Sequence, residues 1–218
     1  IDTSSIGNIK NVKVDYFHEL SNCRLQLSYN IYGNGMVKLK QTLYPSGSEL
    51  PELPRFGMKT TIPSSFNNLE WFGRGPHESY WDRKSSARID RFAGEVWDQT
   101  FKYVRPQETG NKTDVRWMSL YNGSVGIMAK GIPFFDGSVH HYNYANIKPV
   151  RGSQLHGAID IKKEDQIDWL IDFKQMGVGG DNSWGAKPHK KYTLPMDTST
   201  YNLESVSYTH LTLPTSHN

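Results

Sequence analysis

The chain has 218 residues, which is enough for one full-sized domain and too few for two of ordinary size. Its 25 basic and 22 acidic residues give a net charge of +3, and the lack of any run of basic side chains argues against nucleic-acid binding. Hydrophobic residues make up 36% of the sequence, which excludes disorder for most of the chain, but no stretch approaches the roughly 18 apolar residues of a membrane helix.

Two predicted strands form a hairpin near the N-terminus. In residues 24–31 apolar side chains alternate with polar ones, which is typical of a half-buried strand. Residues 33–35, Gly-Asn-Gly, tolerate the positive φ angles of a tight turn, and residues 36–43 then return as the second strand. The Pro- and Ser-rich residues 45–54 are predicted to be a loop between two strands.

Further strands are predicted at residues 115–120 and 166–173, where the same alternation recurs. No long window shows the apolar stripe of a helix, and 19 Gly and 11 Pro interrupt the sequence too often for long helices. Strands that recur without intervening helices indicate an all-β fold, an antiparallel sandwich or barrel. No internal repeat or low-complexity linker divides the chain.

The two ends of the chain carry separate signals. The sequence opens with Ile1 rather than Met, which suggests a cut rather than a natural start. Residues 205–218, SVSYTHLTLPTSHN, resemble the translated read-through of a sequencing adapter, so we expect a non-native tail there and leave it out of functional reasoning. The predicted domain therefore covers residues 1–204.

Few residues show the spacing of a catalytic or metal site. The single Cys23 excludes an internal disulfide and a Cys-based zinc site. His140 and His141 are adjacent, so in a strand their rings point to opposite faces and cannot both bind one metal; we expect one to be buried and the other exposed. Glu78 and Asp82 lie in a segment too rich in Gly and Pro for a helix that would bring them together, and they are predicted to be loop polar groups.

The glycine-dense residues 176–185 have the composition of a sugar-binding loop. They lack the Lys-Ser/Thr of a phosphate-binding P-loop, and no helical pattern follows them. Glycines let the backbone approach a ligand, Asp181 and Asn182 offer hydrogen-bond partners, and Trp184 offers a flat apolar face on which a sugar can stack. The alternative is a tryptophan that plugs one end of the sandwich.

Three segments resemble signature motifs of one protein family. They are residues 71–83 (WFGRGPHESYWDR), 103–111 (YVRPQETGN) and 172–184 (DFKQMGVGGDNSW). In this order they look like the C-terminal domain, or small chain, of the large β-galactosidases of glycoside hydrolase family 2, and the resemblance covers most of the chain. It implies a β-supersandwich of the galactose-mutarotase-like type for residues 1–204, with the family's first strands missing and its closing strand replaced by the tail.

The resemblance implies a parent enzyme that hydrolyses terminal β-D-galactosides such as lactose with retention, by two glutamates in a (β/α)₈ barrel outside this chain. The chain then holds no catalytic residue and is inactive alone. Mg²⁺ and Na⁺ would be bound by other domains, the partners of this chain would be the barrel and a galactoside, and the parent enzyme would be a homo-oligomer. The compartment, cytoplasm or periplasm of a bacterium, stays open.

The resemblance also assigns roles to individual residues of the third motif. Trp184 corresponds to the tryptophan that this domain projects into the active site, where it is a platform for the leaving-group sugar. The residues beside it are predicted to bind substrate or to position the loop: Gly180, Asp181 and Asn182 for the first role, Gly177 and Gly179 for the second.

The two earlier motifs are expected to have structural or interdomain roles rather than sugar contacts. Arg74 and Glu78 suit holding a turn near the barrel. Arg105, Glu108 and Asn111 suit bonding loops to one another.

Two other functions stay open from the residues alone. A stand-alone carbohydrate-binding module is disfavoured by magnitude: a sugar covering about 60 Å² of indole gains about 1.5 kcal/mol, two hydrogen bonds add about 2 kcal/mol, and association costs about 4 kcal/mol or more. A mutarotase-like epimerase would need a histidine and a carboxylate on one concave face, and the sequence pairs none of His140, His141 and His156 with such a partner.

Overall fold

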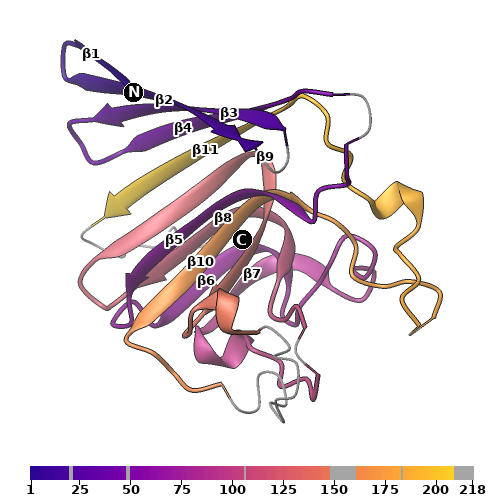
Figure 1. Cartoon of the computed structure of the whole chain (residues 1–218). Helices are drawn as coiled ribbons and strands as arrows, with labels where there is room; N and C mark the ends of the chain where they lie inside the picture. The colour runs from indigo at the N-terminus through magenta and orange to yellow at the C-terminus, as the bar shows by residue number, and fades with distance from the viewer. Residues whose placement is uncertain (20–21, 48–49, 106, 148–160, 183, 209–218) are drawn as a thin grey trace.

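The computed structural model describes the chain except for residues 20–21, 48–49, 106, 148–160, 183 and 209–218. The described part consists of strands joined by loops and short 3₁₀ helices (Figure 1). In chain order the elements are β1 (Asp2–Ile6), β2 (Ile9–His18), β3 (Cys23–Tyr32), β4 (Val37–Pro45), β5 (Arg55–Pro63), β6 (Asn68–Gly75), β7 (Arg88–Glu95), η2 (Trp97–Gln99), β8 (Lys112–Tyr121), β9 (Gly126–His140), η3 (Tyr144–Ile147), β10 (Gln166–Gln175), η5 (Lys190–Tyr192) and β11 (Ser199–Tyr208).

The hairpin predicted near the N-terminus is formed by β3 and β4. The strands pair antiparallel, with Leu27 opposite Gln41 and Ile31 opposite Val37. Gly35 adopts a φ of +84° in the turn, a conformation that residues with a side chain rarely adopt. The predicted strands at residues 115–120 and 166–173 lie within β8 and β10, so these predictions are confirmed.

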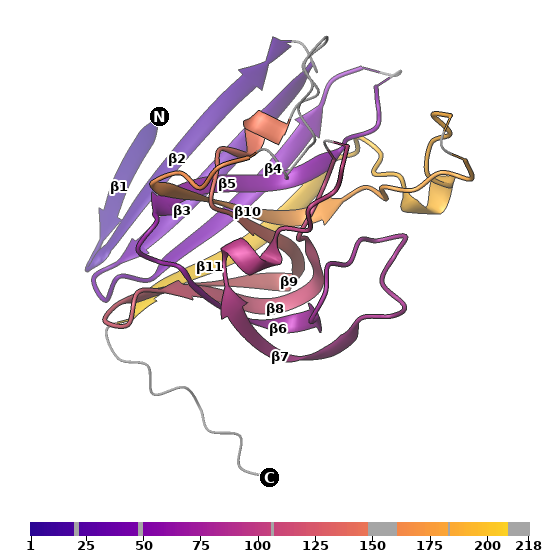
Figure 2. The same ribbon diagram turned by 90° about the horizontal axis from the view of Figure 1, so that it is seen from below.

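The strands form one antiparallel sheet in which β9 is the central element. The order is β1-β2-β3-β4-β11-β9-β8-β6-β7, and β10 joins β9 to β5. The first half of β9 pairs with β11, from Gly126 to Ile132, and its second half pairs with β10, from Asp136 to His140. Because β9 changes partner along its length, the sheet curls and its two wings face each other (Figures 1 and 2).

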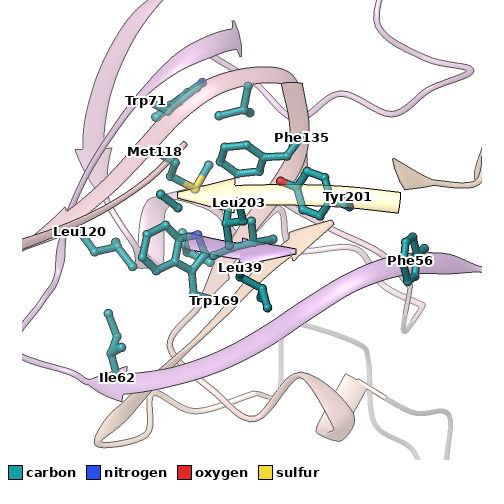
Figure 3. Packing of buried hydrophobic residues seen from close by; sticks show 14 of the residues in the cluster. Leu39, Phe56, Ile62, Trp71, Met118, Leu120, Phe135, Trp169, Tyr201 and Leu203 are labelled. Atoms are coloured by element: carbon teal, nitrogen blue, oxygen red, sulfur yellow. The ribbon is translucent and has the colours of Figure 1, made fainter. Parts of the chain in front are cut away.

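The core lies between these two wings. Leu39 of β4 and Leu203 of β11 belong to the same buried cluster as Trp169 of β10 and Trp71 of β6 (Figure 3). Trp71 and Trp169 are each 1% exposed, and burial of a side chain of this size contributes about 2–3 kcal/mol. The all-β, antiparallel sandwich expected from the sequence is therefore confirmed.

The last described strand, β11, extends into residues 205–218, the predicted non-native tail. Ser205 to Tyr208 continue the pairing of β11 with Ala129 to Gly126 of β9. Residues 209–218 lie outside the described part of the chain. The four residues thus complete a strand whatever their origin.

Candidate functional site

The three motif segments lie together at one end of the sandwich (Figures 1 and 2). The first runs from β6 into the connection to β7, the second precedes β8, and the third runs from the end of β10. We call residues 76–84 and 108–113 the base, and residues 176–182 and 184–189 the Trp loop. In both views the Trp loop projects at the end where the base lies.

Glu78 ties the first motif to the second. Its carboxylate accepts hydrogen bonds from the backbone N–H of Gly110 (2.8 Å), from Arg83 (2.7 Å) and from the hydroxyl of Tyr103. The Glu78 side chain is only 11% exposed, so these charge-assisted bonds are poorly screened by water and correspondingly strong. Glu78 therefore holds this turn, as predicted.

Buried polar bonds join the same two loops beneath Glu78. The backbone N–H of Ser79 donates to the carbonyl of Asn111 (2.8 Å), and the side-chain amide of Asn111 donates to the carbonyl of Ser79 (2.9 Å). The buried Lys112 donates to the carbonyl of Pro76 (3.1 Å), and burial lowers the pKa of Lys112 to about 8. Asn111 thus bonds the two loops, as predicted.

Arg74 fixes the far side of the same connection. It forms an ion pair with Asp114 and donates to the carbonyls of Lys84 (3.3 Å) and Ala87 (2.7 Å). The prediction that Arg74 holds a turn is confirmed. Arg105 is exposed, and its predicted role in bonding loops stays a prediction.

A partly buried group of charges lies around Glu108. Its carboxylate accepts hydrogen bonds from Arg55 and from the hydroxyl of Tyr144, and Arg55 Nη1 also lies 3.2 Å from Asp172 Oδ2. Burial raises the pKa of Glu108, and it raises the pKa of Asp172 to about 7. Asp136, opposite Asp172 in the register of β9 and β10, has its pKa raised by burial to about 6. Burial thus favours the neutral form of these carboxyls.

Two glycines of the Trp loop, Gly177 and Gly180, stand where a side chain would collide. A Cβ on Gly177 would lie 2.6 Å from Asp82 Oδ2, and a Cβ on Gly180 would lie 2.0 Å from the carbonyl oxygen of Ala186. The backbone N–H of Gly177 donates to the carbonyl of Tyr192 (2.8 Å). The close approach of neighbouring groups therefore explains Gly177 and Gly180.

Trp184 lies at the exposed part of the loop. Its side chain is 93% exposed, and its backbone N–H donates to the side-chain carbonyl oxygen of Asn182 (2.8 Å). Asp181 Oδ1 lies 2.7 Å from His189 Nε2. The ring therefore does not plug the end of the sandwich, and the loop presents it to the surroundings.

A cavity of about 540 Å³ lies between the base and the Trp loop. All three motifs contribute to its wall, and Trp184 is not among its lining residues. The residues that line it include Asp82, Arg83, Glu108, Gly179, Asp181 and Tyr192. A cavity with carboxylates, an arginine and exposed backbone amides suits a guest that both donates and accepts hydrogen bonds.

The structure places residues from distant parts of the sequence around this cavity. Gly179, Gly180 and Asp181 line the cavity, whereas Asn182 bonds to the backbone of Trp184, and their predicted roles in binding substrate or positioning the loop stay predictions. Sequence reasoning missed His189, and it placed Asp82 among unspecific loop polar groups. No spacing rule links Asp82 to Gly179, because the two residues are 97 positions apart.

The paired histidines correct one prediction. Both are buried, His140 at 0% and His141 at 5% exposure, so the expectation of one exposed ring is wrong. His140 Nδ1 lies 3.0 Å from the Tyr142 hydroxyl, and His141 Nε2 lies 2.6 Å from Asn67 Oδ1. Asn67 lies just before β6, so this partner of His141 comes from a distant segment, which alternation along a single strand cannot reveal.

Within the described ranges, no three His, Cys, Asp or Glu side chains are grouped so that they could hold a metal ion. The same residues contain no helix with the length and apolar character needed to cross a bilayer.

Comparison with known proteins gives consistent matches over the whole described sandwich. The model of the family described as the β-galactosidase small chain matches residues 2–206. A β-galactosidase of Priestia megaterium is 39% identical over 187 residues, covering 85% of this chain and 17% of the relative. A β-galactosidase of Halalkalibacterium halodurans is 31% identical over 196 residues, covering 88% and 19%. The chain thus spans less than a fifth of these relatives.

Among solved structures, a galactose 1-epimerase of Lactobacillus acidophilus is similar over 95% of this chain and 65% of its own. The two chains are 9% identical and superpose with a TM-score of 0.43.

Proposed function

Because this chain belongs to the β-galactosidase small chain family, we propose that it is the part of a β-galactosidase that lends an indole surface to the active site. The observation that carries the proposal is the position of Trp184, which is 93% exposed on a loop anchored to the sandwich. Trp71 and Trp169, by contrast, are buried in the core. An exposed indole beside polar groups is suited to stack on the apolar C–H face of a sugar.

We propose that the parent enzyme hydrolyses terminal β-D-galactosides with retention of configuration. Two glutamates outside this chain would act as nucleophile and as general acid/base, with their carboxyl groups about 5–5.5 Å apart. This chain would supply no reacting group. The Mg²⁺ and Na⁺ ions would belong to other domains, and the parent enzyme would be a homo-oligomer.

Within this arrangement, Trp184 would bind the leaving-group sugar, and Gly180, Asp181 and Asn182 would lie beside it. Asp181 Oδ1 already lies within hydrogen-bond distance of His189, so its second oxygen is the atom that a sugar hydroxyl could reach. The base would position the loop against the barrel. The active site would then be closed by walls from both parts of the enzyme.

The test is Trp184→Ala in the full-length enzyme. Loss of about 60 Å² of stacking costs about 1.5 kcal/mol, so KM should rise about tenfold while kcat stays measurable. Phe17→Ala, which removes an exposed aromatic ring from β2, is the matched control and should leave both constants unchanged. Complete loss of turnover with unchanged KM would contradict the proposal.

The alternatives have their own readouts. Millimolar or tighter binding of galactose to the purified chain, measured by calorimetry, would indicate a stand-alone carbohydrate-binding module. Interconversion of galactose anomers by the purified chain would indicate a mutarotase-like epimerase.

A further inference from the structure

We propose that Asp82 is a positioning residue. It anchors the Trp loop to the base and thereby fixes the position of Trp184. The effect on activity rests on the proposed function, whereas the effect on the loop does not. Three features of the structure carry this inference: the turn that presents Asp82, the contacts that it makes, and the space that it occupies.

Asp82 stands at the tip of a tight turn. The backbone N–H of Tyr80 donates to the carbonyl of Arg83 (3.0 Å), and the N–H of Arg83 donates to the carbonyl of Tyr80 (2.9 Å). This reciprocal pair leaves Trp81 and Asp82 as the two residues of the tip. Arg83 donates a hydrogen bond to Glu78. The rest of the base therefore fixes the position of the tip.

Both residues of the tip contact the segment that follows β10. Asp82 Oδ2 accepts a hydrogen bond from the backbone N–H of Gly179 at 2.7 Å. The ring of Trp81 meets that of Tyr192 edge to face, with the centroids 6.1 Å apart. The carbonyl of Tyr192 accepts the N–H of Gly177, so the turn supports the loop at two points on either side of Val178.

On the side that faces the Trp loop, the Asp82 carboxylate is closely packed. A Cβ on Gly177 would approach Asp82 Oδ2 to 2.6 Å, so only glycine fits beside it. The second oxygen, Oδ1, is buried and accepts no hydrogen bond from the described residues. A partly desolvated carboxylate binds a backbone N–H more strongly than an exposed one does, and the Gly179 N–H is the donor within reach of Asp82.

These contacts make Asp82 a support and not a sugar ligand. The bonded oxygen faces the backbone of Gly179, and Trp184 follows Gly179 by five residues. Asn182 then fixes the backbone of Trp184 locally. A chain of contacts therefore runs from Glu78 through Arg83 and Asp82 into the Trp loop.

The experiment uses the full-length enzyme with Asp82→Ala, Trp184→Ala and the double variant. Hydrogen exchange at the Gly179 amide should become about tenfold to a hundredfold faster in Asp82→Ala, because a charge-assisted bond is lost. KM for a galactoside should rise about threefold to tenfold with kcat within about twofold. The double variant should have the KM of Trp184→Ala, because Asp82 acts only through that ring.

Two further variants keep the result interpretable. Asp82→Asn retains an acceptor oxygen without the charge, so it should give intermediate exchange and an intermediate KM, and it serves if Asp82→Ala does not fold. Asp90→Asn, an exposed aspartate of β7, is the matched control and should change neither quantity.

The outcomes separate the two proposals. Unchanged exchange at Gly179 in folded Asp82→Ala would overturn the positioning role. KM effects that multiply in the double variant would also overturn it, because Asp82 would then contact substrate itself. Faster exchange at Gly179 in Asp82→Ala, together with an unchanged KM in Trp184→Ala, would support the positioning role and refute the proposed function.

Discussion

The base and the Trp loop lie at the same end of the sandwich, but they are stabilised in opposite ways. In the base, Ser79, Asn111 and Lys112 are buried, and their polar groups bond to one another or to backbone. In the Trp loop, Asp181, Asn182 and the ring of Trp184 are exposed. The buried residues of the base thus belong to the folded core, whereas the loop takes its position from contacts near Gly177 and Gly179.

The difference explains how a surface loop can present a side chain at a defined place. An exposed loop orders itself poorly, because few buried contacts offset the entropy of fixing its backbone. Here the N–H groups of Gly177 and Gly179 bond to Tyr192 and Asp82. The rigid region therefore supplies the order that the exposed region lacks, and mutations in the two regions should have different consequences.

The largest effect is expected from Glu78→Ala, which removes the centre of the base. The buried N–H of Gly110 would lose its acceptor, and the buried Lys112 would lose a nearby negative charge. Unfolding free energy should fall by about 3 kcal/mol, measured by denaturant unfolding of the full-length enzyme. The exposed Glu52→Ala is the control. An equal, small effect for both variants would show that the base is no more rigid than the loop.

The next largest effect is expected in the pH dependence of the unfolding free energy, through the carboxyl of Asp172 near Glu108. Burial raises the pKa of Asp172 to about 7, above its value in the unfolded chain. A carboxyl with a raised folded-state pKa stabilises the fold when protonated, so this contribution is complete below about pH 4 and is lost as the pH rises through about 7. Unfolding free energy should therefore fall by about 2 kcal/mol between about pH 5 and pH 7.

Asp172→Asn should flatten this pH dependence, since an amide does not titrate. The exposed Asp98→Asn is the control and should leave it unchanged. The same slope in Asp172→Asn as in the original enzyme would mean that another group is responsible, with Asp136 the first candidate because burial raises its pKa to about 6.

A smaller effect should distinguish two glycines of the Trp loop. Gly180→Ala places a Cβ 2.0 Å from the backbone oxygen of Ala186, whereas Gly179→Ala places one at an ordinary 3.4 Å from Asp82 Oδ2. The first change should open the loop at a cost of about 1–2 kcal/mol and raise KM several-fold; the second should be close to neutral. Equal KM values in the two variants would show that the loop adjusts freely.

The strands of this fold could be predicted because their signal is local. Leu27 and the other apolar residues of β3 alternate with polar ones, and Gly35 marks the turn to β4. The strand order could not be predicted, because β11 lies between β4 and β9, and β10 joins β9 to β5. Alternation shows which face of a strand is buried, but not which strand lies beside it.

The site divides in the same way. Trp184 can be singled out as a candidate from its own segment, because a tryptophan among Gly, Asp and Asn is unusual in a core, while its role in the active site stays a prediction. The contact between Asp82 and Gly179 depends on how two distant connections meet in space. The expectation that one of His140 and His141 is exposed fails for a similar reason, since the hydrogen-bond partner of His141, Asn67, comes from another part of the chain.

The smallest effect should come from His189→Ala, which tests whether the exposed part of the loop needs its own contacts. His189 and Asp181 lie 2.7 Å apart, but their side chains are 58% and 78% exposed, and water screens such pairs so well that they contribute less than about 1 kcal/mol. Unfolding free energy and the Gly179 amide exchange should both stay unchanged. Asp181→Asn is the matched variant: a rise in KM with Asp181→Asn alone would indicate that this carboxylate binds substrate, whereas equal rises in both would assign Asp181 to holding the loop. In the second case the loop would be ordered from its outer side as well as from the base, and the contrast between the two regions would be weaker than the buried contacts imply.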